Sequence, residues 1–263
     1  MAKIVITAPH SSSFVPPELI NRYALPHEQI HDVFDSGTFE VLKLISNKNI
    51  TILPAEVSRL VVDLNRFPDD HRNIGIFREK TFRGNQIFIE GKHFTEKEKN
   101  YYRDKYYTPW HKKLLDALTL EPILLHIDLH NTDETKFCLS AYTQGKPLRM
   151  QDFTDFDIAN RSAYKNPYEP IDSAGLTFPG KEMEFLIASA KKHFEKITTN
   201  PRITGSSFMR GGAIIQIARD KANWVNGTAR SLQFEIQRKY FTKQKDLAEA
   251  IQGLTNDIVN HLI

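Results

Sequence analysis

Apolar and polar positions alternate along the chain in two rhythms, one typical of buried strands and one typical of amphipathic helices. Short β-branched or apolar runs predict strands, and apolar residues spaced three and four apart predict helices. The predicted strands are residues 3–8, 50–53, 59–64, 122–129 and 232–236, with a further β segment that Arg210 opens and that continues to Ile217. The predicted helices are residues 30–46, 95–118, 182–196 and 246–263.

Strands that alternate with helices favour crossover connections, and these predict an α/β fold with a parallel or mixed sheet. Pro109 interrupts the longest helical pattern, and we expect a bend there because proline lacks the amide N–H. Residues 69–91 are polar and without period, which predicts an irregular excursion over the surface. No repeat or linker divides the sequence, so we expect a single domain over residues 1–263.

The composition is that of a folded protein of ordinary character and narrows the classes of function. Hydrophobic residues make up 40% of the 263 residues and charged residues 25%, which is enough for a sizeable core. The net charge of +3 is spread along the chain without a basic stripe. It therefore does not predict a nucleic-acid partner, although it suits small anionic substrates.

Cysteine content and the N-terminal sequence limit the cellular setting. Cys138 is the single cysteine, which excludes an intramolecular disulfide and a thiolate zinc cluster. The apolar run that ends at Ala8 is too short for a signal sequence or a membrane span. We therefore expect a cytoplasmic protein that does not associate with a membrane.

Polar residues follow several predicted strands, in positions where the ends of parallel strands form a crevice. His10 follows the first strand, Asn65 and Arg66 follow the third, and His130 ends the fourth. A catalytic zinc site needs about three histidine or carboxylate ligands, and His10 and His130 are the first candidates. Asp128 lies on the same strand face as His130 and either orients an imidazole or caps the loop at Asn131.

A third ligand is required, and the sequence offers several choices. Asp35 lies at the start of a helical pattern whose other face is apolar. The same position suits a helix N-cap or an acidic residue of the first turn. His31 and Asp32 are neighbours that could take its place, so the residues alone leave the third ligand open.

Glu235 lies inside an otherwise apolar strand pattern. Alternation places Gln233 and Glu235 on one face, opposite Leu232, Phe234 and Ile236. If that face is buried, the carboxylate must be paired, bound to a metal or shifted in pKa, because burying it alone is costly. The functional interpretation is a general base beside a metal-activated water, and the alternative is a solvent-exposed strand face.

Arginines near these strand ends suit an anionic substrate. Arg66 with Asn65 could hold a carboxylate, and Arg59 could polarise a carbonyl and stabilise an oxyanion. Arg210 and the two glycines after it could supply another anion contact, although a plain turn explains the glycines equally well. A structural ion pair between Arg66 and Asp63 or Asp69 is the alternative for Arg66.

On these residues the chain resembles the N-formylglutamate amidohydrolase family. The most specific match is the sequence Ser-Arg-Leu-Val-Val-Asp-Leu-Asn-Arg at residues 58–66. The other matching segments occur in the family's order and cover nearly the whole chain: residues 8–16, Asp35 with the following helix, and residues 102–111, 128–130, 210–212 and 232–236.

The resemblance implies membership of the zinc-dependent carboxypeptidase and aspartoacylase superfamily. It implies a three-layer α/β/α domain with a mixed, mostly parallel sheet, one zinc ion, a metal-activated water and a glutamate base. Carried over, His10 and His130 are metal ligands, with Asp35 as the third, and Glu235 is the base. Asn65, Arg66 and Arg210 bind the substrate, and Arg59 polarises its carbonyl.

Two positions depart from the pattern that the resemblance implies. Ser13 stands where the superfamily has the glutamate of a His-x-x-Glu pair, and Gln216 stands where an arginine is expected after the paired glycines. The first departure makes Asp35 the candidate for the carboxylate ligand. The second weakens the assignment of glutamate as the natural side chain of the substrate.

The expected activity is zinc-dependent hydrolysis of an N-acyl amino acid, N-formyl-L-glutamate or a relative, to a carboxylate and an amine. A zinc exopeptidase or deacylase that acts on peptide-like substrates is the alternative among enzymes. A non-catalytic binding module on the same fold is the alternative from another class.

Overall fold

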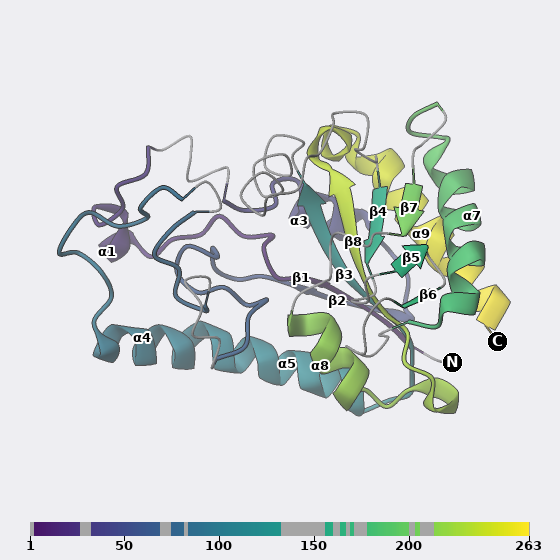
Figure 1. The fold of residues 1–263 in the computed structure, drawn as a ribbon, viewed down its shortest axis with the longest axis horizontal. Coiled ribbons are helices and arrows are strands. Elements are labelled where there is room, and N and C mark those ends of the chain that lie inside the picture. Colours follow the sequence, from purple (N-terminus) through teal and green to yellow (C-terminus); the bar gives the residue numbers. More distant parts are fainter. Residues whose placement is uncertain are drawn as a thin grey trace.

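The computed structural model describes residues 3–26, 33–68, 75–81, 84–132, 156–159, 164–166, 169–170, 178–199, 203–205 and 213–262. Its centre is a six-stranded sheet in the order β2-β1-β3-β8-β4-β7 (Figure 1). The first four strands in this order are parallel, β4 runs antiparallel to β8, and β7 runs parallel to β4. The strand bounds are β1 Lys3–Ala8, β2 Ile50–Pro54, β3 Ile123–Thr132, β4 Phe156–Ala159, β7 Ile203–Gly205 and β8 Ser231–Gln237.

Helices cover both faces of this sheet, as Figure 1 shows. The helices α3 (Thr38–Leu44), α7 (Gly180–Phe194) and α9 (Gln244–Leu262) enclose one apolar cluster with the sheet. The helices α5 (Thr108–Thr119) and α8 (Ala213–Lys221) pack with a second cluster on the opposite face. The predicted α/β class with a mixed, mostly parallel sheet between helical layers is confirmed.

Shorter elements complete the described chain. They are the helix α1 (Pro17–Ile20), the 3-10 turns η3 (Val225–Gly227) and η4 (Arg238–Thr242), and a separate pair of strands, β5 (Tyr164–Asn166) and β6 (Glu169–Pro170). Within the described residues, 75–81 and 84–91 form isolated bridges and turns, as expected for the polar excursion. No described helix has the length and apolar character that crossing a bilayer requires. That residues 1–263 form one domain stays a prediction.

The two faces of the central strands differ in chemistry because side chains alternate along a strand. On β3, Leu125, Ile127 and Leu129 enter the cluster with α7 and α9. His126, Asp128 and His130 alternate with them and are also buried, so they line the opposite face. On β8, Leu232, Phe234 and Ile236 enter the first cluster in the same way, while Ser231, Gln233, Glu235 and Gln237 alternate with them and are buried. The sheet therefore has one apolar face and one buried face rich in polar groups, and the candidate site lies on the latter.

The long predicted helix forms as three consecutive parts: α4 (Glu96–Tyr102), the π-helical turn η1 (Arg103–Tyr107) and α5. A capping box between Thr95 and Glu98 begins it, in which each side chain bonds the other residue's backbone amide. The wide turn η1 ends two residues before Pro109, whose missing N–H removes one helical hydrogen bond. The irregularity that the proline predicted therefore takes the form of a π-helical turn, a feature often found at functional sites.

Two predicted strands are wrong. Residues 59–64 form turns, in which the backbone N–H groups of Val61 and Val62 both donate to the carbonyl of Ser58. Leu60, Val61 and Val62 are all fully buried, so the run is continuously apolar although it is not extended. The segment that ends at Ile217 is helical from Ala213 onward, and its first residues, 210–212, lie outside the described residues. There, burial of one helix face against β3 and β8 overrides the β-propensity of the isoleucines.

The helix predicted over residues 30–46 is shorter than expected, because α3 begins only at Thr38. Gly37 precedes it with φ of +83°, a left-handed conformation that glycine adopts without strain. A Cβ atom at this position would lie 2.8 Å from Cβ of Phe241. Glycine is therefore required here on both counts, and it fixes the course of the loop that carries Asp35.

Candidate metal centre

Three predicted ligands meet at the carboxyl-terminal ends of β1 and β3. His10 follows β1, Asp35 lies in the loop before α3, and His130 lies near the end of β3. Their exposed fractions are 4%, 6% and 4%, and one ligand atom from each lies within 4.8 Å of the others. The N–H of Asp35 donates to the carbonyl of His10 at 2.8 Å, which joins the two loops. His31 and Asp32, the alternative ligands, lie outside the described residues.

The ring of His10 is held by a buried carboxylate on its far side. Its Nε2 lies 2.8 Å from Oδ1 of Asp63, and its Nδ1 lies 3.9 Å from Oδ2 of Asp35. Burial and the charge of Arg59 lower the pKa of His10 to about 4, so the ring is neutral at pH 7 and carries one proton. That proton belongs on Nε2, where Asp63 accepts it, and this leaves the lone pair of Nδ1 facing Asp35.

His130 repeats this arrangement with a different aspartate. Its Nε2 lies 3.0 Å from Oδ2 of Asp128, and its Nδ1 lies 2.9 Å from Oδ2 of Asp35. Burial alone would lower the pKa of His130, but Asp128 and Asp35 outweigh it and hold the pKa well above its usual value. Without a metal, a proton on Nδ1 occupies the direct path to Asp35, so binding of a cation there would release that proton.

The spacing and the donor types fit a divalent transition metal such as zinc. In a tetrahedral zinc site, bonds of about 2.0–2.2 Å place two ligand atoms roughly 3.3 Å apart. The separations of 2.9 Å and 3.9 Å from Asp35 to the two Nδ1 atoms lie on either side of this value. Each of the two imidazoles also donates its other N–H to a carboxylate, as histidines that bind metals usually do.

Asp63 joins the metal centre to a group of buried arginines. Its Oδ2 accepts from Nη2 of Arg59 at 2.9 Å and lies 3.1 Å from Nε of Arg78. Burial alone would raise the pKa of Asp63, but Arg59 and His10 outweigh it and keep the pKa well below its usual value. The ion pair considered between Arg66 and Asp63 is thus made by Arg59 and Arg78, and Asp69 lies outside the described residues.

Asn65 and Arg66 lie beside this group but differ in what they contact. Nδ2 of Asn65 donates to Oδ2 of Asp128 at 3.1 Å, and Oδ1 accepts from the N–H of Ile214 at 3.1 Å. The Asn65 side chain therefore bridges β3 to the start of α8. Arg66 is half-buried, and its Nη1 donates to the carbonyl of Asn65 at 2.9 Å.

One residue of the π-helical turn and one of α5 hold the backbone of this segment in place. The hydroxyl of Tyr107 donates to the carbonyl of Arg66 at 2.7 Å, and Nε2 of His111 lies 2.9 Å from the carbonyl of Leu64. A carbonyl only accepts, so Nε2 of His111 carries the proton. Because burial lowers the pKa of His111 to about 4, the ring is neutral and donates only through this bond.

Glu235 lies on the strand next to His130, and the two residues are direct partners in the β3–β8 register. Its side chain is buried and Oε1 accepts from Nε2 of Gln233 at 2.6 Å, so the solvent-exposed alternative does not apply. Its charge contributes to the raised pKa of His130, after the larger effects of burial and the two aspartates. Arg210 lies outside the described residues.

Sequence reasoning missed two parts of the site. Arg78, almost fully buried, comes from the irregular excursion, where no periodic pattern marks it. Burial lowers its pKa to about 9. The buried polar residues Thr7, His126 and Ser231 were also missed, although the sequence His-x-Asp-x-His at residues 126–130 indicates three polar groups on one strand face.

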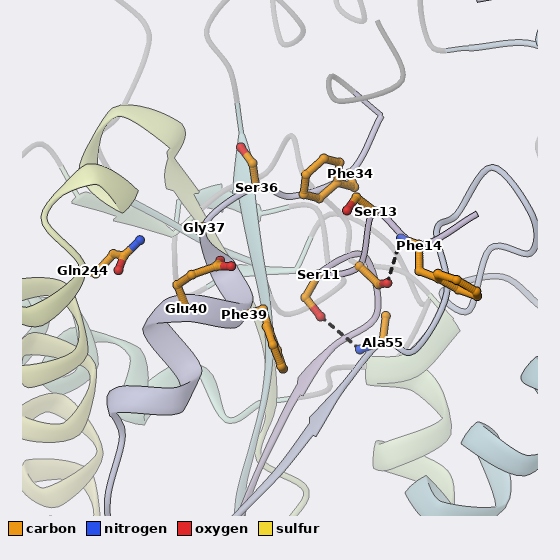
Figure 2. Close-up of a pocket in the computed structure, with 11 residues that line it drawn as sticks. Ser11, Ser13, Phe14, Phe34, Ser36, Gly37, Phe39, Glu40, Ala55 and Gln244 are labelled. Atoms are coloured by element: carbon orange, nitrogen blue, oxygen red, sulfur yellow. Dashed lines mark hydrogen bonds between the residues drawn. The ribbon is translucent and has the colours of Figure 1, made fainter. Parts of the chain in front are cut away.

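A pocket of about 740 Å³ opens beside the loops that carry two of the ligands (Figure 2). Ser11 and Ser36, which follow His10 and Asp35, lie on its wall. Three phenylalanines, Phe14, Phe34 and Phe39, also line it, and Phe14 is 49% exposed. Among the described residues that line it, Glu40 is the one charged side chain. Four serines and Gln244 share the lining, so the pocket combines aromatic surface with neutral polar groups, and its one acidic side chain disfavours a second carboxylate.

Comparisons with known proteins agree with this geometry. Residues 2–154 match the family model of N-formylglutamate amidohydrolase. The fold is similar to the crystal structure of N-formylglutamate amidohydrolase from Ralstonia eutropha JMP134, with 17% identity, a TM-score of 0.72, and coverage of 99% of this chain and 94% of that one. It is also similar to the crystal structure of a gene product from Agrobacterium tumefaciens, with 15% identity, a TM-score of 0.62, and coverage of 99% and 91%.

A comparison with curated protein sequences gives no match. At these identities, the two structural likenesses establish the fold alone. The family model includes the three candidate ligands together with Arg59, Asn65 and Arg66, whereas Glu235 lies beyond it. Because the match extends over more than half of the chain, the protein belongs to the N-formylglutamate amidohydrolase family.

Proposed function

We propose that this protein is a zinc-dependent amidohydrolase that cleaves N-formyl-L-glutamate, or a related N-acyl amino acid, to a carboxylate and a free amine. Family membership supports an enzyme that hydrolyses amides. The observation that carries the zinc dependence is the buried group of His10, Asp35 and His130, in which a carboxylate backs each imidazole. We further propose that the protein acts in the cytoplasm on a small anionic substrate.

His10 and His130 would hold the metal through Nδ1, and Asp35 through a carboxylate oxygen. When bound, zinc supplies a Lewis acid that polarises the amide carbonyl and lowers the pKa of a coordinated water toward ~7. Asp63 and Asp128 keep the two imidazoles turned for this role by accepting their Nε2 protons. Residues near the metal centre would carry out proton transfer and bind the charged groups of the substrate.

Glu235 is proposed as the general base. Its carboxylate takes a proton from the attacking water and later delivers it to the amine nitrogen as the C–N bond breaks. The water oxygen forms the new bond to the acyl carbon, so the products are a carboxylate and an amine. The burial of Glu235 and its register position opposite His130 support this role.

Three arginines are proposed to handle the charge of the substrate and of the developing oxyanion. Arg59, fixed by its bond to Asp63, would stabilise the oxyanion. Arg66 would anchor the substrate carboxylate beside Asn65, with Arg210 as a further anion contact. The bond from Asn65 to Asp128 and the bond from Tyr107 to the Arg66 carbonyl keep this segment rigid.

The replacement Glu235→Gln tests the proposal. It keeps the shape and removes the base, so the rate of N-formylglutamate hydrolysis should fall by ~10²–10⁴-fold while bound zinc stays near one ion per chain. Glu56→Gln is the matched control, because Glu56 is exposed and forms a surface ion pair with Lys113. A fully active Glu235→Gln variant would contradict the proposed base.

The pocket beside the site favours a second candidate, a deacylase for substrates with an apolar group. Its phenylalanines suit such a group, and Glu40 opposes another carboxylate. Rates for N-formylglutamate and for N-formyl or N-acetyl derivatives of phenylalanine and leucine separate the two candidates. Faster hydrolysis of the apolar derivatives would show that the natural substrate carries an apolar side chain in place of that of glutamate. The proposed hydrolytic chemistry would be unchanged.

A further inference from the structure

A line of buried polar side chains continues from the metal centre into the sheet. Thr7 on β1, His126 on β3 and Ser231 on β8 come from three distant parts of the chain, and each is fully buried. Oγ1 of Thr7 lies 2.7 Å from Oδ1 of Asp128 and 3.1 Å from Nε2 of His126. Nδ1 of His126 lies 2.7 Å from Oγ of Ser231.

These hydrogen bonds have a defined direction. Both oxygens of Asp128 face donors, since Oδ2 accepts from Nδ2 of Asn65 at 3.1 Å and lies 3.0 Å from Nε2 of His130, so the carboxylate acts as an acceptor. The single proton of the Thr7 hydroxyl therefore goes to Asp128, since its other acceptor, the Ile127 carbonyl, is farther away at 3.4 Å. The Thr7 oxygen must then accept from Nε2–H of His126.

The direction of the hydrogen bond between His126 and Ser231 follows from the charge of His126. Burial lowers the pKa of His126 to about 4, so the ring is neutral and has one N–H. With that proton on Nε2, Nδ1 accepts the hydroxyl proton of Ser231. Each donor in the order Ser231, His126, Thr7 thus has one acceptor, and the line ends on the carboxylate of Asp128.

This line determines which oxygen of Asp128 meets His130. Oδ2 receives Nε2–H of His130 and the amide of Asn65, while Thr7 holds Oδ1. A carboxylate bound through one oxygen can rotate about its last side-chain torsion, and a second anchor removes this freedom. Apolar side chains could replace these buried polar pairs at little cost in stability. A fully hydrogen-bonded set of polar side chains is therefore better explained by the orientation that it gives to Asp128.

We propose that Thr7 and His126 are positioning residues that act through Asp128 to keep Nδ1 of His130 directed at Asp35, and so set the affinity of this site for zinc. The inference deepens the proposed function and rests on its metal site. It assigns a role to His126, a fully buried histidine outside the group of three candidate ligands. On the side of His10, the described residues that anchor Asp63 include two arginines, Arg59 and Arg78, in place of a chain of neutral donors.

The test compares Thr7→Val with Thr7→Ser. Valine keeps the shape and removes the hydroxyl, so zinc affinity, measured by competition with a chromophoric chelator, should fall ~10-fold or more. Serine restores the hydroxyl and should bind zinc nearly as the wild type does. Thr255→Val is the matched control, because Thr255 is also fully buried and its hydroxyl donates to the Gln252 carbonyl within α9.

The absorption spectrum of the cobalt-substituted protein gives a second readout. A change in its d–d bands in Thr7→Val but not in Thr255→Val would show altered ligand geometry rather than general destabilisation. Wild-type zinc affinity in Thr7→Val, or equal losses in Thr7→Val and Thr7→Ser, would overturn the inference. A wild-type protein that binds neither zinc nor cobalt would instead contradict the proposed function and this inference together.

Nuclear magnetic resonance tests the direction of the line without any variant or metal. Ring ¹⁵N shifts of metal-free wild-type protein at pH 7 should show His126 neutral, with its proton on Nε2. A proton on Nδ1 would reverse the order of donors and overturn the inference.

Discussion

Replacing Asp63 with asparagine should damage the metal centre more than any single loss of contact suggests. Three hydrogen-bond donors and a second guanidinium surround this carboxylate: Nε2 of His10 and the N–H of Asn65 lie at Oδ1, Nη2 of Arg59 bonds Oδ2, and Arg78 forms an ion pair with Oδ2. An asparagine side chain has one acceptor oxygen and one NH₂ group. Whichever way the amide is turned, its NH₂ group faces two of these four N–H groups, and neither of them can accept its hydrogen atoms.

The expected size follows from burial. Asp63 is fully buried, and Arg59 and Arg78 are nearly so, so the variant leaves two guanidinium groups without their shared negative charge. Removing one partner of a buried ion pair costs about 3–5 kcal/mol, so the free energy of unfolding should fall by that amount. Loss of the carboxylate behind a histidine ligand lowers metal affinity by ~10–100-fold, which is the expected change for zinc.

Urea unfolding in the presence of a chelator measures the first effect, and competition with a chromophoric chelator measures the second. Asp116→Asn is the control, because the pair Lys112–Asp116 is exposed and should change stability by ~0.5 kcal/mol or less. A loss below about 1 kcal/mol together with unchanged zinc affinity would refute the reasoning, since Asp63 would then neither balance the arginines nor orient His10.

Two further predictions concern backbone strain and pH. Gly37→Ala should lose more stability than Gly84→Ala in urea unfolding, because both glycines have φ above +80° but only the Gly37 position brings a Cβ within 2.8 Å of Phe241; equal losses would show that the contact is harmless. His126 has its folded-state pKa lowered to about 4 by burial, so the unfolded chain gains the proton first as the pH falls from about 6.5. The free energy of unfolding should therefore decrease between pH 6.5 and 4, by up to about 3 kcal/mol from this residue. Urea unfolding across this pH range should show a smaller decrease in His126→Gln. Identical pH dependence in the two proteins would contradict a neutral buried ring.

Much of the sheet could be predicted because its strands show a regular pattern of apolar and polar residues. The runs at β1, β3 and β8 carry regularly spaced apolar residues and are ended or followed by polar ones, and alternation correctly separates Leu125 and Ile127 from Asp128 and His130. Two parallel strands with histidines at their ends are also enough to bring His10 and His130 together.

Other parts of the fold and site depend on contacts that no local pattern encodes. Residues 59–64 are as apolar as a strand because they are buried on all sides, yet they turn. Arg78 reaches Asp63 from a segment without periodicity. Asp35 could not be separated from its neighbours by sequence alone, since its place depends on the left-handed Gly37 and on a backbone bond to His10.

The central claim is that a metal held by His10, Asp35 and His130 works with Glu235 to hydrolyse an N-acyl amino acid. The most direct measurement determines zinc content and the rate of N-formylglutamate hydrolysis on the same samples of wild-type protein and Glu235→Gln. The account predicts about one zinc per chain in both and hydrolysis in the wild type alone, lost with a chelator and restored by zinc. Undiminished hydrolysis by metal-free wild-type protein, or by Glu235→Gln, would contradict it.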